Sequence, residues 1–131
     1  KTTVDVDLVF FPDSGEMYKA IQLLKETLNI NIELASPLDF LPPLAGWKER
    51  SIFIRKVKNV SFFHCDLYLQ MLAKIQRGWK QDLTDVIGFL KLDIDRKKLL
   101  ILFDKIKIDF IKYPSSNAEK LERKLKKFLH E

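Results

Sequence analysis

The sequence predicts an α+β fold, with strands in its N-terminal half and helices in its C-terminal half. In several short segments before residue 66, apolar side chains alternate with polar ones, as they do in strands with one buried face. After residue 66, apolar side chains recur every three or four positions, as on amphipathic helices. The 131 residues and the 47% hydrophobic content are sufficient for one compact unit. We therefore expect residues 1–66 to form an α/β core and residues 67–131 to form a helical region packed on it.

A strand, a helix and a second strand are predicted before residue 36. Residues 2–11 and residues 29–35 alternate apolar with polar side chains. Residues 12–15 have the composition of a turn. The segment that follows this turn has one apolar helical face, formed by Met17, Ala20, Ile21, Leu24 and Leu28. Two strands joined by a helix are typically parallel, so we expect a parallel crossover unit.

The middle of the sequence predicts a loop and a hairpin. Residues 36–47 contain three prolines and a glycine, which helices and central strands do not easily accommodate. We expect a long irregular loop there. Residues 51–57 and 60–65 are rich in residues that favour strands, and Lys58 and Asn59 between them are suited to a tight turn.

The C-terminal half predicts helices over residues 67–77, 82–90, 95–110 and 117–129. Gly78 is placed to end the first of these helices. The formal net charge is +5, and the excess of Lys and Arg lies after residue 90. The last helix therefore has a basic exterior, which permits a phosphate-containing partner but is also typical of a solvated helix face.

Composition argues against several classes of protein. No run of about 18 apolar residues is present, so no transmembrane helix and no membrane partner are predicted. No basic segment followed by an apolar leader is present either, and we expect a soluble, cytoplasmic protein. Cys65 is the only cysteine and there are two histidines, so neither an internal disulfide nor a structural zinc site is expected. The sequence begins at Lys1 and not at a methionine, which suggests a fragment or a processed product.

Two carboxylates on the first predicted strand are candidates for metal binding. Asp5 and Asp7 are two positions apart, so their side chains share one face of the strand. Neighbouring carboxylates repel unless a cation lies between them, and their hard oxygen atoms suit Mg²⁺ or Mn²⁺. The alternative is a strand that has an exposed acidic face. Spacing alone does not decide, because Asp93 and Asp95 have the same spacing between two predicted helices, where helix capping is the better interpretation.

A second charged group lies on the first two C-terminal helices. Lys74 and Arg77 are three positions apart on one helix, so both can project toward a common anion. Asp82 and Asp85 have the same spacing on the next helix. The alternative is structural. In that case Asp66 and Asp82 cap their helices, and the two basic residues neutralise the acids of the following helix.

These segments together resemble a prokaryotic nucleotidyltransferase-like family within the minimal nucleotidyltransferase superfamily. The motif TVDVDL at residues 3–8 resembles the metal-binding strand of minimal nucleotidyltransferases. The other segments that carry the resemblance are ELASPLDFLPPL at residues 33–44, FFHCDLY at 62–68, AKIQRG at 73–78 and DLTDV at 82–86. The resemblance covers nearly the whole chain. The family is similar to the abortive-infection toxin nucleotidyltransferases of type IV toxin–antitoxin systems.

The resemblance implies a mixed β-sheet of the nucleotidyltransferase type in the N-terminal half and a C-terminal helical bundle. It also implies metal-dependent transfer of a nucleoside monophosphate from a nucleoside triphosphate to an acceptor, either RNA or protein. By their match to the family motifs, Asp5 and Asp7 are expected to bind Mg²⁺ or Mn²⁺. Lys74 is expected to contact phosphate, and Asp82 to complete the catalytic site.

Arg77 and Asp85 are further candidates for substrate binding, and Glu33 and Asp66 are alternative third metal ligands. The glycine-rich motif that precedes the metal-binding strand in the wider group has no counterpart in this sequence. Two hypotheses follow. The chain is either a metal-dependent nucleotidyltransferase or a non-catalytic interaction or regulatory module of the toxin–antitoxin kind, with a cognate partner protein.

Overall fold

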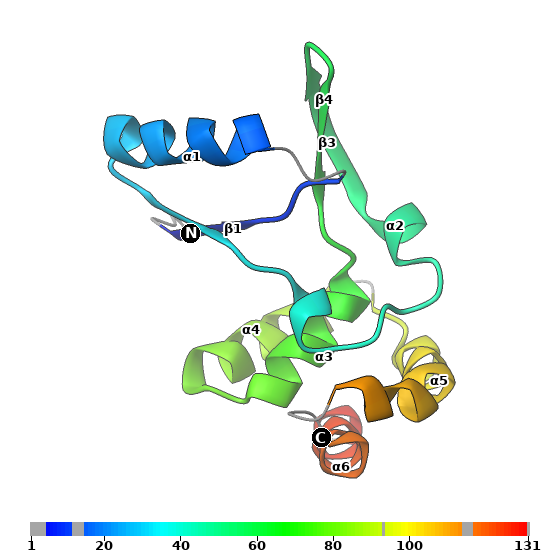
Figure 1. Ribbon diagram of the computed structural model, residues 1–131. Coiled ribbons are helices and arrows are strands. Elements are labelled where there is room, and N and C mark those ends of the chain that lie inside the picture. The colour runs from blue at the N-terminus through cyan, green and yellow to red at the C-terminus, as the bar shows by residue number, and fades with distance from the viewer. Residues whose placement is uncertain (1–4, 12–14, 93, 114–116, 131) are drawn as a thin grey trace. The chain divides into compact units, whose positions relative to one another are not determined.

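The computed structural model describes residues 5–11, 15–92, 94–113 and 117–130 (Figure 1). The structure is mixed α+β, as the sequence predicts. The chain divides into two compact units, Lys1–Asp39 and Phe40–Glu131. This division lies at a different place from the boundary after residue 66 that the sequence suggested, since the hairpin belongs to the second unit together with the helices.

The first unit contains the predicted strand, helix and strand. These elements are β1 (Asp5–Leu8), α1 (Gly15–Leu28) and β2 (Asn31–Leu34), followed by the short 3-10 helix η1 (Pro37–Asp39). The two strands are parallel, so the predicted crossover is confirmed. Asn29 has a positive φ of 51°, a left-handed conformation that Asn tolerates and that ends helix α1. The side chains of Ile21 on α1 and Ile32 on β2 are buried.

The second unit begins with an exposed hairpin. After the short helix α2 (Trp47–Arg50), strands β3 (Ile52–Val57) and β4 (Val60–His64) pair antiparallel, which confirms the predicted hairpin. The register pairs Phe53 with Phe63 and Arg55 with Phe62, so one residue of β3 is extra and forms a β-bulge. Lys58, with a φ of 53°, makes the turn in the left-handed region. All residues of both strands are exposed.

Helices form the rest of the described part of the second unit. They are α3 (Leu67–Arg77), α4 (Lys80–Leu90), α5 (Arg96–Ile106), the 3-10 helix η2 (Lys107–Lys112) and α6 (Ala118–His130). Their fully buried side chains include Leu69, Leu72, Ile75, Val86, Leu99, Phe103 and Leu125. Gly78, with a φ of 71°, ends α3 as predicted. Asp95 accepts a hydrogen bond from the backbone N–H of Lys98 at 3.1 Å, which confirms its predicted role as a helix cap.

The mixed sheet that the resemblance implies for the N-terminal half is not confirmed. In the part of the chain that is described, β1 bonds only to β2, and β3 bonds only to β4, so there are two separate two-stranded sheets in different units. The predicted helix over residues 95–110 is also shorter, because its last turns tighten into η2. Parts of the predicted first strand and first turn, together with Asp93, lie outside the described residues.

Among the described residues, no helix is both long enough and apolar enough to cross a membrane.

Candidate functional site

An acidic face on the β1–β2 pair contains two of the predicted metal ligands, Asp7 and Glu33. The parallel register places Asp5 opposite Asn31 and Asp7 opposite Glu33. Paired residues on neighbouring strands point to the same face, and strands in a sheet are about 4.8 Å apart. Asp7 and Glu33 therefore belong to one face of the sheet. The sequence predicted Asp5 and Asp7 as a pair, and the register places Glu33 beside Asp7.

The side chains on this face are accessible to a ligand. Asp7 and Glu33 are exposed, and Glu33 Oε1 accepts a hydrogen bond from Asn31 Nδ2 at 3.0 Å. The donors are carboxylate and amide oxygens, which are the ligands that Mg²⁺ and Mn²⁺ prefer. Among the side chains that are described, no three acidic, histidine or cysteine residues are already gathered as a metal site. The side chain of Asp5 lies outside that set.

Asp66, the other candidate third ligand, is a buried structural group in the second unit. Only 1% of Asp66 is exposed, and Arg50 binds both of its oxygens, through Nε to Oδ1 at 3.1 Å and through Nη2 to Oδ2 at 2.7 Å. Asp66 Oδ1 also accepts from the backbone N–H of Tyr68 and caps α3. The capping role of Asp66 was predicted from the sequence, but its ion pair with Arg50 was not. Arg50 is 16 positions earlier, and no local sequence signal indicates this contact.

Lys74, Arg77, Asp82 and Asp85 are brought together between α3 and α4, and we call them the charged tetrad. Arg77 donates through Nε to Asp82 Oδ2 at 2.7 Å and through Nη2 to Asp82 Oδ1 at 2.5 Å. Lys74 Nζ lies 2.8 Å from Asp85 Oδ2 and 3.9 Å from Asp82 Oδ1. The predicted proximity of these residues is therefore present, and the two cations face the two carboxylates of the same unit.

Asp82 is the most buried member of the charged tetrad. It is 1% exposed, whereas Arg77 is about half exposed. Its hydrogen bonds with the Arg77 guanidinium hold the pKa of Asp82 below its usual range, because they stabilise the charged carboxylate more than burial disfavours it. The backbone N–H of Trp79 donates to Asp82 Oδ2 at 3.2 Å, so Asp82 also caps the start of α4.

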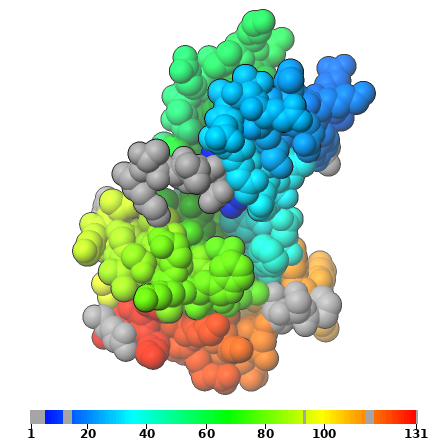
Figure 2. Space-filling view, turned by 90° about the vertical axis from the view of Figure 1, so that its left-hand side faces the viewer, coloured from blue at the N-terminus to red at the C-terminus, as the bar shows by residue number. Residues whose placement is uncertain are grey.

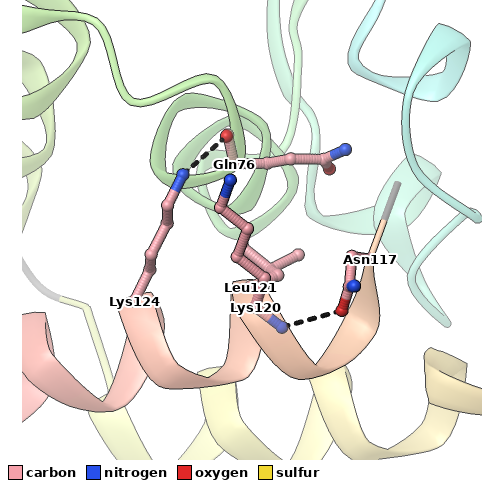
Figure 3. A pocket seen from close by; sticks show the side chains of 5 residues that line it. All are labelled: Gln76, Asn117, Lys120, Leu121 and Lys124. Carbon is pink, nitrogen blue, oxygen red and sulfur yellow. Dashed lines mark hydrogen bonds between the residues drawn. The ribbon is translucent and has the colours of Figure 1, made fainter. Parts of the chain in front are cut away.

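A cavity of about 280 Å³ lies between the end of α3 and the start of α6 (Figure 3). Its lining residues are Gln76, Asn117, Lys120, Leu121 and Lys124. Lys124 Nζ donates to the backbone carbonyl of Gln76 at 3.2 Å, and Asn117 caps α6 by accepting from the backbone N–H of Lys120 at 2.9 Å. None of the predicted site residues lines this cavity. Both polar contacts fasten helix ends, which is a structural role.

Cys65 does not provide a nucleophile at neutral pH. Burial and the neighbouring Asp66 carboxylate raise the pKa of its thiol to about 11. The reactive thiolate is therefore scarce at this position.

The chain matches one protein family over residues 1–130, the family described as "Nucleotidyltransferase of unknown function (DUF6036)". No curated protein and no solved structure matches the chain. The match spans nearly the whole sequence, including the strand of Asp5 and Asp7 and the helices of the charged tetrad. The chain belongs to the DUF6036 family of nucleotidyltransferases of unknown function.

Proposed function

We propose that this protein is a metal-dependent nucleotidyltransferase, in which the acidic face of β1–β2 holds Mg²⁺ or Mn²⁺ on a nucleoside triphosphate. The proposal is supported by the parallel register, which pairs Asp7 with Glu33 on one face of β1–β2. Neighbouring carboxylates of like charge are unfavourable on a sheet without a compensating cation. Membership of a nucleotidyltransferase family supplies the reaction class. A bound metal ion would neutralise charge on the phosphates during transfer to an RNA or protein acceptor.

In this proposal Glu33, and not Asp66, is the third carboxylate. Glu33 is exposed beside Asp7 in the same unit. Asp66 is buried, and both of its oxygens are occupied by Arg50. Binding a metal ion at Asp66 would break this ion pair and leave a guanidinium without its carboxylate partner, which is costly in a buried site.

The charged tetrad then has two roles. Lys74 is given the role of contacting phosphate. Its ammonium has three N–H donors, and of the two carboxylates that it faces only that of Asp85 lies within hydrogen-bond distance. Asp82 is assigned a positioning role, since Arg77 and the N–H of Trp79 satisfy its oxygens. This differs from the catalytic role that the family resemblance implies for Asp82.

Transfer of label from α-³²P nucleoside triphosphates tests the proposal. The full-length protein is incubated with Mg²⁺ or Mn²⁺ and with either total RNA or total protein as acceptor. We expect Asp7→Asn and Glu33→Gln to lower labelling by about a hundredfold or more, since even outer-shell partners of metal ligands change activity by roughly 10–100-fold. The matched control is Glu26→Gln, an exposed acid on α1, and it should keep full activity.

Mn²⁺ binding followed by electron paramagnetic resonance gives a readout that does not depend on the acceptor. Asp7→Asn should weaken Mn²⁺ binding, and Asp66→Asn should leave it unchanged in folded protein. Unchanged labelling by Asp7→Asn would overturn the assignment of the metal site. Loss of Mn²⁺ binding in Asp66→Asn, with β1–β2 intact, would overturn the choice of Glu33.

The second candidate function is a non-catalytic interaction or regulatory module, with a cognate partner protein. It is favoured by the charged tetrad, whose two cations already face two carboxylates of the same unit, as in a purely structural network. Under this hypothesis the folded protein binds neither Mn²⁺ nor nucleotide. Equilibrium titrations with both ligands distinguish the two functions without knowledge of the acceptor.

A further inference from the structure

We propose that the β3–β4 hairpin is a binding surface for single-stranded nucleic acid. The inference concerns the second unit alone and does not depend on the proposed nucleotidyl transfer. It rests on the charge of the hairpin, on the placement of its aromatic side chains, and on the exposure of both of its faces.

The hairpin is a basic segment. Residues 51–65 contain Arg55, Lys56 and Lys58 and no Asp or Glu. All three basic residues are exposed, and none of them forms an ion pair with another residue in the described part of the chain. An uncompensated cluster of positive charge at the end of a projecting ribbon attracts a phosphate backbone.

Aromatic rings lie beside these cations on both faces of the hairpin. Arg55 is paired with Phe62, so a guanidinium and a ring share one face. Phe53 is paired with Phe63 on the other face, where their rings meet edge to face with centroids 5.5 Å apart. The next pair on this second face contains Lys56. The β-bulge in β3 produces this arrangement, because it shifts the alternation of β3 against that of β4.

The rings are available for stacking. Phe53 is 55% exposed, Phe62 42% and Phe63 53%. Figure 1 shows the hairpin extending away from helices α3 to α6 of its own unit, and Figure 2 shows its green surface standing clear of the surfaces of those helices. Exposed aromatic rings next to cations are the combination that binds single strands, since unpaired bases stack on the rings while the backbone contacts the charges.

Other occupants fit the hairpin less well. A second copy that paired edge to edge would bring two sets of Arg55, Lys56 and Lys58 together, and like charges on neighbouring strands repel. The core of a protein–protein interface is depleted in lysine, whereas lysine is part of this surface. A nucleic acid duplex keeps its bases stacked on one another, so it offers the rings no free base faces. A single strand offers phosphates to the cations and free base faces to the rings.

Fluorescence anisotropy with labelled twelve-nucleotide oligomers tests the proposal on the full chain. The probes are single-stranded RNA, single-stranded DNA of the same sequence, and the RNA duplex. Arg55→Gln/Lys56→Gln should weaken single-strand binding at least about tenfold and lower the salt slope by about 1.4, at roughly 0.7 per lost phosphate contact. Phe53→Leu/Phe62→Leu should weaken binding by about fivefold or more.

Matched controls separate the hairpin from general effects. Lys97→Gln/Lys127→Gln removes the same charge from exposed positions on α5 and α6, and Ile52→Leu/Ile54→Leu changes apolar hairpin side chains without removing a ring. Both controls should bind like the unchanged protein. Circular dichroism melting verifies that every variant is folded.

Three results would overturn the inference. One is equal binding by Arg55→Gln/Lys56→Gln and by the control that removes lysines from the helices. Another is tighter binding of the duplex than of either single strand. The third is concentration-dependent dimerisation in sedimentation that hairpin variants abolish, with no binding of single strands, because this would identify the surface as an interface between copies.

Discussion

Arg77 and Asp82 form a two-point ion pair across the turn between α3 and α4. The bond from Nε is 2.7 Å long and that from Nη2 is 2.5 Å, and the carboxylate is buried while the guanidinium is half exposed. Trp79 lies between them in the sequence, with its ring 4.4 Å from the guanidinium carbon of Arg77 and its N–H bonded to Asp82. Asp82 and Arg77 thus each make several of the contacts that hold the turn between the two helices.

Asp82→Asn should destabilise the protein by about 2 kcal/mol, since it removes the charge that a neighbouring guanidinium and an N–H require. The half-exposed guanidinium can be solvated by water, which keeps the loss below that of a fully buried pair. Asp85→Asn is the matched control and should cost less, because Asp85 and Lys74 are both about a quarter exposed whereas Asp82 is only 1% exposed. Urea denaturation measures both variants, and equal losses would contradict the structural ranking of these two pairs.

The stabilising effect of Asp82 should disappear at acidic pH. The pKa of Asp82 is lower in the folded protein than in the unfolded chain, so the unfolded chain binds the proton more readily. The contribution is fully present above the unfolded pKa of about 3.9 and is lost as the pH falls through the lower, folded pKa. Urea denaturation of the unchanged protein and of Asp82→Asn, from about pH 7 to about pH 2, measures it. A stability difference that does not shrink toward the acidic end would refute this linkage.

Arg50→Ala should destabilise the second unit more than any single change in the charged tetrad, by about 3 kcal/mol or more. Asp66 is 1% exposed and would keep its charge without its two-point partner. Arg50 Nη1 also donates to the carbonyl of Ala45 at 2.6 Å, so the loop before α2 loses a contact as well. Thermal and urea denaturation measure the loss. Arg55→Ala, an exposed arginine on the hairpin, is the control and should change stability by less than about 0.5 kcal/mol.

Local signals in the sequence were sufficient for most elements of the fold. Gly78 ends α3 because only glycine easily adopts the left-handed conformation there, and Asp95 caps α5 because its carboxylate reaches the free N–H of the first turn. Each signal acts within a few residues. Joining the strand pairs into one sheet depends instead on contacts between distant segments, and among the described strands the expected mixed sheet is not confirmed.

Contacts between distant segments also limited the prediction of the candidate site. The expected shared face of Asp5 and Asp7 follows from strand geometry alone, but the position of Glu33 beside Asp7 depends on the register of β2. A shift of one residue would turn Glu33 to the opposite face. The partner of Asp66 was likewise unpredictable, because Arg50 is distant in the sequence and ends a short helix, α2, that was not predicted between the loop and the hairpin.

Two glycines near the ends of α3 and α4 should respond to alanine in opposite directions. Gly78 has a φ of 71°, and an added Cβ would lie 3.3 Å from Lys124 Nζ and 3.6 Å from the carbonyl oxygen of Ile75. Gly78→Ala should therefore cost about 1–2 kcal/mol from the left-handed backbone, with little added by the flexible lysine end. Gly88 lies within α4 and has open space around it, so Gly88→Ala should stabilise the protein by roughly 0.5–1 kcal/mol. Paired urea denaturation curves measure both changes, and a stabilising Gly78→Ala would show that α3 does not end in the left-handed conformation described.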